Sequence, residues 1–364
     1  MSGRGDGLEA IQEAIKLYRQ LAVEYPAAIN HELAGSLNNL SSCLADVGRE
    51  EEGLQAIQEA VELYRQLAAD CPTAFNPNLA LSLSGLSRRL AFVGRQEDGL
   101  EAVQEAVELY RRLAADRLPA SSLTLAGSLN NLSLSLADVG RQEDGLQAIQ
   151  EAVELTRPLA AVRPVAFEPE LALFLSNLSA RLGDAGCQED SLQVIQEAVE
   201  IRRRLVADRP ALFNPDLASN LSNLSLRLMD VGHWEDGLQA TQEAVELYRQ
   251  IVADRPAKFN LGLAGSLNNL SICLANVGRH EDGLQAIQEA VELYRQLAAD
   301  RPAQFNLRLA SSLDNLSRRL IDVGRQEDGL RAIQEAVELT RGRSFRSIYS
   351  ISYLVPRKTL PSSS

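Results

Sequence analysis

Two adjacent columns of polar side chains recur through the sequence at a spacing that could bind a peptide. At one position of a repeated block the residue is Asn, Ser or Asp, and the next residue is Asn in six of seven copies. Because an amide both donates and accepts hydrogen bonds, a row of amides can pair with the backbone of an extended peptide. The same amides could instead bond to a neighbouring helix or form a plain polar face. The first-column candidates for peptide contact are Asn38, Asn130, Asn268 and Asp314.

Arginines and large apolar residues follow four residues after the first column. Arg88 and Arg318 could form bidentate bonds with carboxylates or phosphates of a partner. The alternative is that the arginines of this region pair with nearby aspartates of the same chain. At the equivalent position in other copies, Leu134, Leu226 and Ile272 could anchor an apolar side chain of a peptide or fill a seam between copies.

Catalytic chemistry has little support in the sequence. His31, His233 and His280 are isolated and occupy non-equivalent positions, so they lack the partners of a metal site or a general base. No phosphate-binding loop, dinucleotide fingerprint, GxSxG or HExxH motif is present. The four cysteines form no CxxC pair. We therefore expect a protein that is not an enzyme and holds no cofactor and no metal.

The charge and the apolar runs restrict the partners. The chain has 364 residues with 36 Lys and Arg against 49 Asp and Glu, a formal charge of −13. Such a chain repels nucleic-acid phosphate. Its apolar runs are far shorter than the ~20 residues that span a bilayer, and the first residues have no apolar signal region. We expect a cytoplasmic protein with protein or peptide partners, and neither nucleic acid nor membrane.

One block of 46 residues is copied along the chain. Each copy contains a Val-Gly pair, which recurs every 46 residues without an insertion and is replaced once by Ala-Gly. The pairs begin at Val47, Val93, Val139, Ala185, Val231, Val277 and Val323. The regular spacing indicates one repeated structural unit and not a set of independent domains.

Each copy predicts two helices. Leu33, Leu37 and Leu44 lie on one stripe of a first helix of about 16 residues, which we call the A helix. A similar stripe marks a second helix of about 20 residues, the B helix, and Gly48 supplies the turn between the two. A short extended link should follow, for example with Pro210 ending the B helix, Asn214 as N-cap and Pro215 in the first turn of the next A helix.

The segment from Asn39 to Val61 resembles the tetratricopeptide repeat, in its kinesin-light-chain-like variant. The positions that carry the resemblance are Leu40, Ser41, Leu44, Gly48, Gly53, Ile57 and Ala60. The resemblance implies an all-α, right-handed α-solenoid of antiparallel helix hairpins, with the A helices lining a concave groove. Two features depart from the family: the unit has 46 residues and not about 34, and the small B-helix position is mostly Gly where Ala is customary.

We expect the solenoid over residues 1–341, with a half repeat at 5–26 and then seven 46-residue units, the last truncated. Residues 342–364 are basic and have the composition of a disordered tail. The expected function is a protein–protein interaction scaffold that binds an extended peptide segment in the groove. The alternatives are a self-associating array, through the uncapped first helix, or a fragment of a larger multidomain signalling protein whose effector domain is absent.

Overall fold

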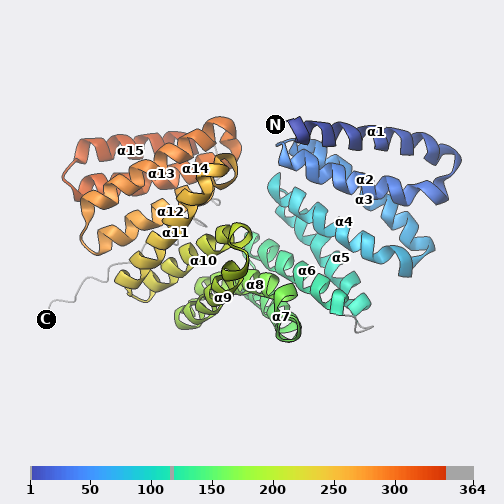
Figure 1. The fold of residues 1–364 in the computed structure, drawn as a ribbon. Helices are drawn as coiled ribbons and strands as arrows, with labels where there is room; N and C mark the ends of the chain where they lie inside the picture. The colour runs from blue at the N-terminus through green and yellow to red at the C-terminus, as the bar shows by residue number, and fades with distance from the viewer. Residues whose placement is uncertain (1, 115–118, 342–364) are drawn as a thin grey trace. The chain divides into compact units, whose positions relative to one another are not determined.

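The computed structural model describes residues 2–114 and 119–341, and every regular element in those ranges is an α-helix. A and B helices alternate along the chain, and within each of the two halves described below they lie side by side with their sequence neighbours (Figure 1). The B helices are α1 (Ser2–Glu24), α3 (Glu50–Asp70), α5 (Gln96–Ala114), α7 (Gln142–Val162), α9 (Gln188–Asp208), α11 (Trp234–Asp254), α13 (His280–Asp300) and α15 (Gln326–Thr340). The A helices are α2 (Pro26–Asp46), α4 (Pro72–Phe92), α6 (Pro119–Asp138), α8 (Pro164–Asp184), α10 (Pro210–Asp230), α12 (Pro256–Asn276) and α14 (Pro302–Asp322).

The turn from an A helix to its B helix depends on a glycine, as predicted. Gly48 has a φ of 79°, in the left-handed region that other residues rarely adopt. Its N–H donates to the carbonyl of Ala45, and the N–H of Arg49 donates to the carbonyl of Leu44. These two bonds are the Schellman pattern, which satisfies the last carbonyls of the A helix. The six equivalent glycines have φ between 81° and 83°.

The link from a B helix to the next A helix differs from the prediction. It is a single residue, such as Arg209, whose φ of −142° and ψ of 72° are extended as expected before a proline. Pro210 then begins helix α10 directly, because the first helical residue needs no N–H donor. Asn214 is therefore inside the helix and is not its N-cap. Pro215 is also internal, and α10 continues through it with one backbone hydrogen bond fewer.

The core repeats an apolar stripe of each A helix packed against an apolar stripe of each B helix. The central leucine of the predicted stripe is almost completely buried in every copy, and the alanine three residues earlier is buried with it. The seven leucines are Leu37, Leu83, Leu129, Leu175, Leu221, Leu267 and Leu313. Neither helix type could bury this surface alone, so each hairpin is stabilised by its neighbours.

The A and B helices of a hairpin approach most closely where a glycine of the B helix faces a buried serine of the A helix. A Cβ placed on Gly145 would lie 3.1 Å from the backbone oxygen of Ser133 and 3.6 Å from the Cβ of Leu136. Gly53, Gly99 and Gly283 meet the equivalent serines at 3.0–3.1 Å. The short distance between the two helices therefore favours a small residue here, which is glycine in most copies and Ser191 in α9.

The chain forms two compact halves that divide between Ala185 and Gly186. The N-terminal half contains α1–α8 and the C-terminal half contains α9–α15, and each is a stack of hairpins. The predicted basic tail at 342–364 lies outside the described residues.

A ladder of ion pairs joins successive B helices. An arginine of one B helix contacts a glutamate 40 residues later, at 2.5–2.7 Å, in six places among the described residues. The pairs are Arg19–Glu59, Arg65–Glu105, Arg111–Glu151, Arg203–Glu243, Arg249–Glu289 and Arg295–Glu335. Their side chains are about half exposed, so each pair contributes only about 0.2–1 kcal/mol. The same type of pair recurs along the surface formed by the B helices.

We expect Gly145→Leu to lower the melting temperature clearly, because a side chain at this position forces α6 and α7 apart and costs about 1–3 kcal/mol. Gln147→Leu, two residues along the same helix and exposed, should barely shift it. Thermal unfolding followed by circular dichroism measures both variants. Equal shifts would contradict the hairpin register.

We expect the Arg249–Glu289 pair to show a small, salt-sensitive coupling. A double-mutant cycle with Arg249→Ala and Glu289→Ala should give about 0.2–1 kcal/mol at low ionic strength and less at 1 M NaCl, because salt screens exposed charges. A coupling that does not change with salt would show that the contact is not mainly electrostatic.

Candidate partner-binding surface

The first amide column lies at the joints between successive A helices. In the N-terminal half, Asn38 Nδ2 donates to Ser82 Oγ at 2.8 Å, and Asn177 Nδ2 donates to Asn130 Oδ1 at 2.6 Å. In the C-terminal half, Asn268 Oδ1 accepts from Ser312 Oγ at 3.2 Å and from Asn315 Nδ2 at 3.0 Å. Serines replace the amides elsewhere in the column, where Ser84 pairs with Ser128 and Ser222 with Ser266. The column is therefore a ladder of hydrogen bonds between hairpins.

These bonds bury the amides that the sequence singled out. Asn130 and Asn268 are 7% and 8% exposed, while Asn38 is half-buried. The amide oxygens of Asn130 and Asn268 face neighbouring hairpins, as in the second interpretation of the column, and Asn268 also lines the pocket described below. The hydrogen bonds of this ladder hold neighbouring hairpins together, so a partner would contact the side chains next to the ladder.

The candidate arginines divide into paired and unpaired groups. Arg318 contacts Asp314 at 2.9 Å within α14, so these two candidates neutralise each other. Arg88 on α4 is exposed and has no carboxylate at ion-pair distance in the part of the chain that the structure describes. Burial by surrounding groups, followed by the adjacent Arg89 guanidinium, lowers the pKa of Arg88. Arg88 keeps a free guanidinium on the A-helix surface.

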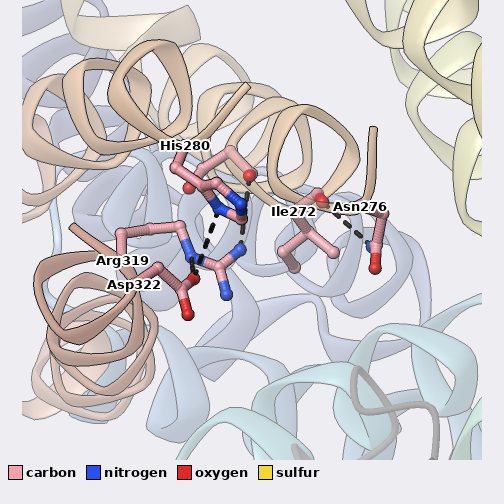
Figure 2. A network of polar contacts seen from close by, with 6 residues as sticks. Ile272, Asn276, His280, Arg319 and Asp322 are labelled. Atoms are coloured by element: carbon pink, nitrogen blue, oxygen red, sulfur yellow. Dashed lines mark hydrogen bonds and ion pairs between the residues drawn. The ribbon is translucent and has the colours of Figure 1, made fainter. Parts of the chain in front are cut away.

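Four A helices carry an arginine at the next position, and each of these arginines is held by an acidic residue. Figure 2 shows the arrangement at α14. Arg319 Nε lies 3.0 Å from Asp322 Oδ2, and Arg319 Nη1 donates to the carbonyl of Ser271 on α12 at 3.5 Å. His280 Nδ1 is 3.9 Å from the same Asp322 carboxylate. Beside this network, Asn276 is bonded to the carbonyl of Ile272. The network ties the end of α12 to α13 and α14.

The apolar candidates are accessible to different degrees. Leu134 on α6 is 41% exposed, whereas Leu226 and Ile272 are half-buried in the C-terminal half. Sequence reasoning missed Leu81 on α4 and Leu173 on α8, which occupy equivalent positions and are 61% and 47% exposed. Exposed leucines thus lie on three A helices of the N-terminal half.

The C-terminal half has a pocket where the N-terminal half has those leucines. A cavity of about 530 Å³ opens on the A helices α10, α12 and α14. At the positions equivalent to Leu81 and Leu173, these helices carry the small residues Ser219, Gly265 and Ser311. Because three successive A helices carry small residues in this row, the space above them stays open.

Most of the residues that line this pocket carry a hydroxyl or an amide group. The residues that line it are Ser219, Ser222, Asn223, Tyr248, Leu261, Gly262, Gly265, Ser266, Asn268, Asn269, Tyr294, Gln304, Leu307, Arg308, Ser311 and Ser312. Two of them, Tyr248 of α11 and Tyr294 of α13, come from B helices and are buried. Burial raises the pKa of both phenols, so they are neutral hydrogen-bonding groups at physiological pH.

The Tyr248 ring packs against the backbone of Gly262, where a side chain would overlap it. A Cβ on Gly262 would lie 2.5 Å from the Tyr248 ring, so no side chain fits there without moving the tyrosine. The equivalent residue in other copies has a side chain that contacts the B helix, as Asn78 does with the Tyr64 hydroxyl at 3.4 Å. The sequence signal for this pocket was the coincidence of Gly262 and Gly265 on one A helix, which sequence reasoning did not use.

The arrangement offers binding groups and little else. Among the described residues, no three His, Cys, Asp or Glu side chains lie close enough to hold a metal ion. None of the described helices has the length and apolar character needed to cross a membrane. The described part of the A-helix surface provides hydrogen-bonding groups, the guanidinium of Arg88 and exposed leucines.

Two family models match parts of the chain. A model described as a tetratricopeptide repeat matches residues 263–301. A model described as anaphase-promoting complex subunit 5 matches residues 28–71, 113–161 and 298–349. Among curated proteins, no relative matches the chain.

Solved structures share the fold at low identity. BtubC (BKLC) from P. vanneervenii is 16% identical over 73% of this chain and 96% of its own, with a TM-score of 0.53. Aspartyl phosphate phosphatase F from Bacillus subtilis is 10% identical over 88% of this chain and 74% of its own, with a TM-score of 0.62. The nearly identical TPR-like repeats of a putative kinesin light chain from Podosopora anserina are 16% identical over 58% and 93%, with a TM-score of 0.42. The all-α solenoid of helical hairpins is the architecture that this chain shares with BtubC and with aspartyl phosphate phosphatase F.

We expect Asn268→Ala to destabilise the protein by about 1–2 kcal/mol, because Ser312 and Asn315 both lose their acceptor in a buried joint. Asn39→Ala is the matched control, since Asn39 is an exposed amide of the second column. Thermal and urea unfolding of both variants measure the effect. An Asn268→Ala variant as stable as the control would show that these hydrogen bonds do not stabilise the protein.

Proposed function

The repeats of this chain are of the tetratricopeptide type, and on that premise we propose that it is a protein–protein interaction scaffold. The scaffold binds an extended peptide segment of a partner along its A helices. The observation that carries this proposal is the pocket of about 530 Å³ on α10, α12 and α14, which is large enough for one or two side chains. Its amide and hydroxyl groups suit the backbone of an extended peptide.

The differences among copies support the same surface. The B helices repeat nearly the same residues, and the Arg–Glu ladder lies on them. The A helices instead vary at the positions that face the open surface: the one that includes Gly262 reads Glu32, Asn78, Thr124, Glu170, Asp216, Gly262 and Arg308. Core leucines of the same helices do not vary. Variation that spares the core and gathers on one surface is suited to recognising a specific partner sequence.

The scaffold acts by holding its partner and carries out no reaction of its own. In this proposal it works in the cytoplasm, alone or as the interaction part of a larger signalling protein. Leu134 and Arg88 of the N-terminal half, with Leu226 and Ile272 of the C-terminal half, are secondary contacts for the same peptide or another part of the partner.

We expect a random nonapeptide library displayed on phage to yield clones that bind the immobilised full chain through the pocket. Gly265→Leu should weaken these clones about 10-fold or more by filling the pocket. The variant should fold, because leucine occupies the equivalent position in α4 and α8. Gln239→Leu, on the exposed side of α11, is the control. The proposal fails if no clone is enriched, or if the two variants bind alike while their melting temperatures match the parent.

Self-association is a second candidate, favoured by exposed apolar residues on α1 and α15. Leu330, Ile333 and Val337 of α15 are exposed, although their equivalents Leu284 and Ile287 are buried in α13. On α1, Ile15 is buried against α2, and Leu8 and Ile11 are half-buried. The exposed large apolar residues of the described part of α1 are Leu17, Leu21 and Val23, at 55%, 46% and 83%.

If copies associate through α1, light scattering should show a mass that grows with concentration, and Leu17→Glu with Leu21→Glu should abolish the growth. Leu81→Glu with Leu173→Glu changes equally exposed leucines on A helices and is the control. A mass that stays monomeric at all concentrations would exclude this candidate.

A further inference from the structure

The pocket on α10, α12 and α14 is lined by a single charged residue. Arg308 is the single charged residue among those that line it, and no carboxylate does. The whole chain has a formal charge of −13, so a pocket without an acidic side chain departs from the composition around it. The remaining polar groups of the wall are hydroxyls and amides.

Arg308 also differs from the other arginines of the A helices. Arg89, Arg181, Arg227, Arg318 and Arg319 each have a carboxylate within 2.9–3.3 Å. Arg308 is exposed and has no carboxylate at ion-pair distance within the described ranges; its neighbour is the Tyr294 hydroxyl. Arg88 is the other A-helix arginine without a carboxylate, and it lies in the N-terminal half. A guanidinium that the chain leaves uncompensated beside a cavity is available to a ligand.

Neutral donors complete the recognition. The walls place Ser311 on the same helix as Arg308, and Asn269 on α12. A carboxylate is acceptor-only and needs such donors, whereas an ammonium group would find no negative charge in this wall. Gly262 occupies on α12 the position that Arg308 occupies on the adjacent α14, so at this place the buried Tyr248 ring lines the pocket instead of an α12 side chain.

We propose that this pocket takes the side-chain carboxylate of an Asp or Glu in the partner segment, with Arg308 as its ion-pair partner. The inference rests on the proposed peptide-binding function and names the chemistry that its ligand must carry. Arg308 is at the rim, so the pair sets specificity and the neutral groups contribute the remaining affinity.

The test uses the same phage library, in which each peptide is fused to the coat protein through its carboxyl end and has no free C-terminal carboxylate. Clones enriched on the full chain should carry Asp or Glu at one fixed position. For such a clone, Arg308→Gln in the protein and Glu→Gln (or Asp→Asn) in the peptide should each weaken binding about 10-fold, and the two together should weaken it little further. Arg308→Lys should recover part of the loss. Arg331→Gln removes an exposed arginine from α15 and is the control.

The outcomes separate this inference from the function on which it rests. Clones that lose binding with Gly265→Leu but keep it with Arg308→Gln uphold the peptide-binding pocket and overturn the acidic assignment. Synthetic peptides that bind only with a free C-terminus, and not when amidated, overturn the side-chain carboxylate. A library that enriches no clone overturns the peptide-binding function itself.

Discussion

The close approach of the two helices in each hairpin is the constraint on which the rest of the structure depends. The backbone carbonyl of a buried serine on the A helix lies very close to a glycine of the B helix. At Ser133 and Gly145, a Cβ added to the glycine would be 3.1 Å from the carbonyl oxygen. This contact sets the distance between the helices and therefore which leucines can interdigitate. With the hairpin fixed, the glycine turn and the one-residue link leave little freedom for the next copy.

Two ladders then join one hairpin to the next, and they differ in energy and in location. The A helices are joined by buried hydrogen bonds among serines and asparagines, where losing a partner is costly. The B helices are joined by half-exposed Arg–Glu pairs, where each contact is weak and screened by salt. The joints between A helices thus contribute stability at the same surface that is proposed to bind a partner. Some polar side chains of this surface therefore bond between hairpins, and others are left to contact the partner.

That division explains how the proposed site is built. The column that includes Asn268 serves the joint, and the neighbouring row, with Ser219, Gly265 and Ser311, is free to vary. Large residues in that row give exposed leucines on α4 and α8, and small residues give a pocket on α10, α12 and α14. One scaffold can therefore present different chemistry in different copies without changing its core, as repeat architectures allow because each copy contacts only its neighbours.

The sequence by itself determined the repeat, the helical hairpin and the glycine turn, because these follow from local periodicity and from the conformation of single residues such as Gly48. It also identified the polar column and the arginines as notable, but it could not assign their partners. The bond from Asn177 to Asn130 joins residues 47 positions apart, and Arg89 pairs with Glu50 on another helix, so only the packed hairpins decide them. The length of the link was likewise missed, since Pro210 begins a helix as readily as it ends one. The pocket was missed because it is made by side chains that are absent: Gly262 and Gly265 leave space only when three A helices stand side by side.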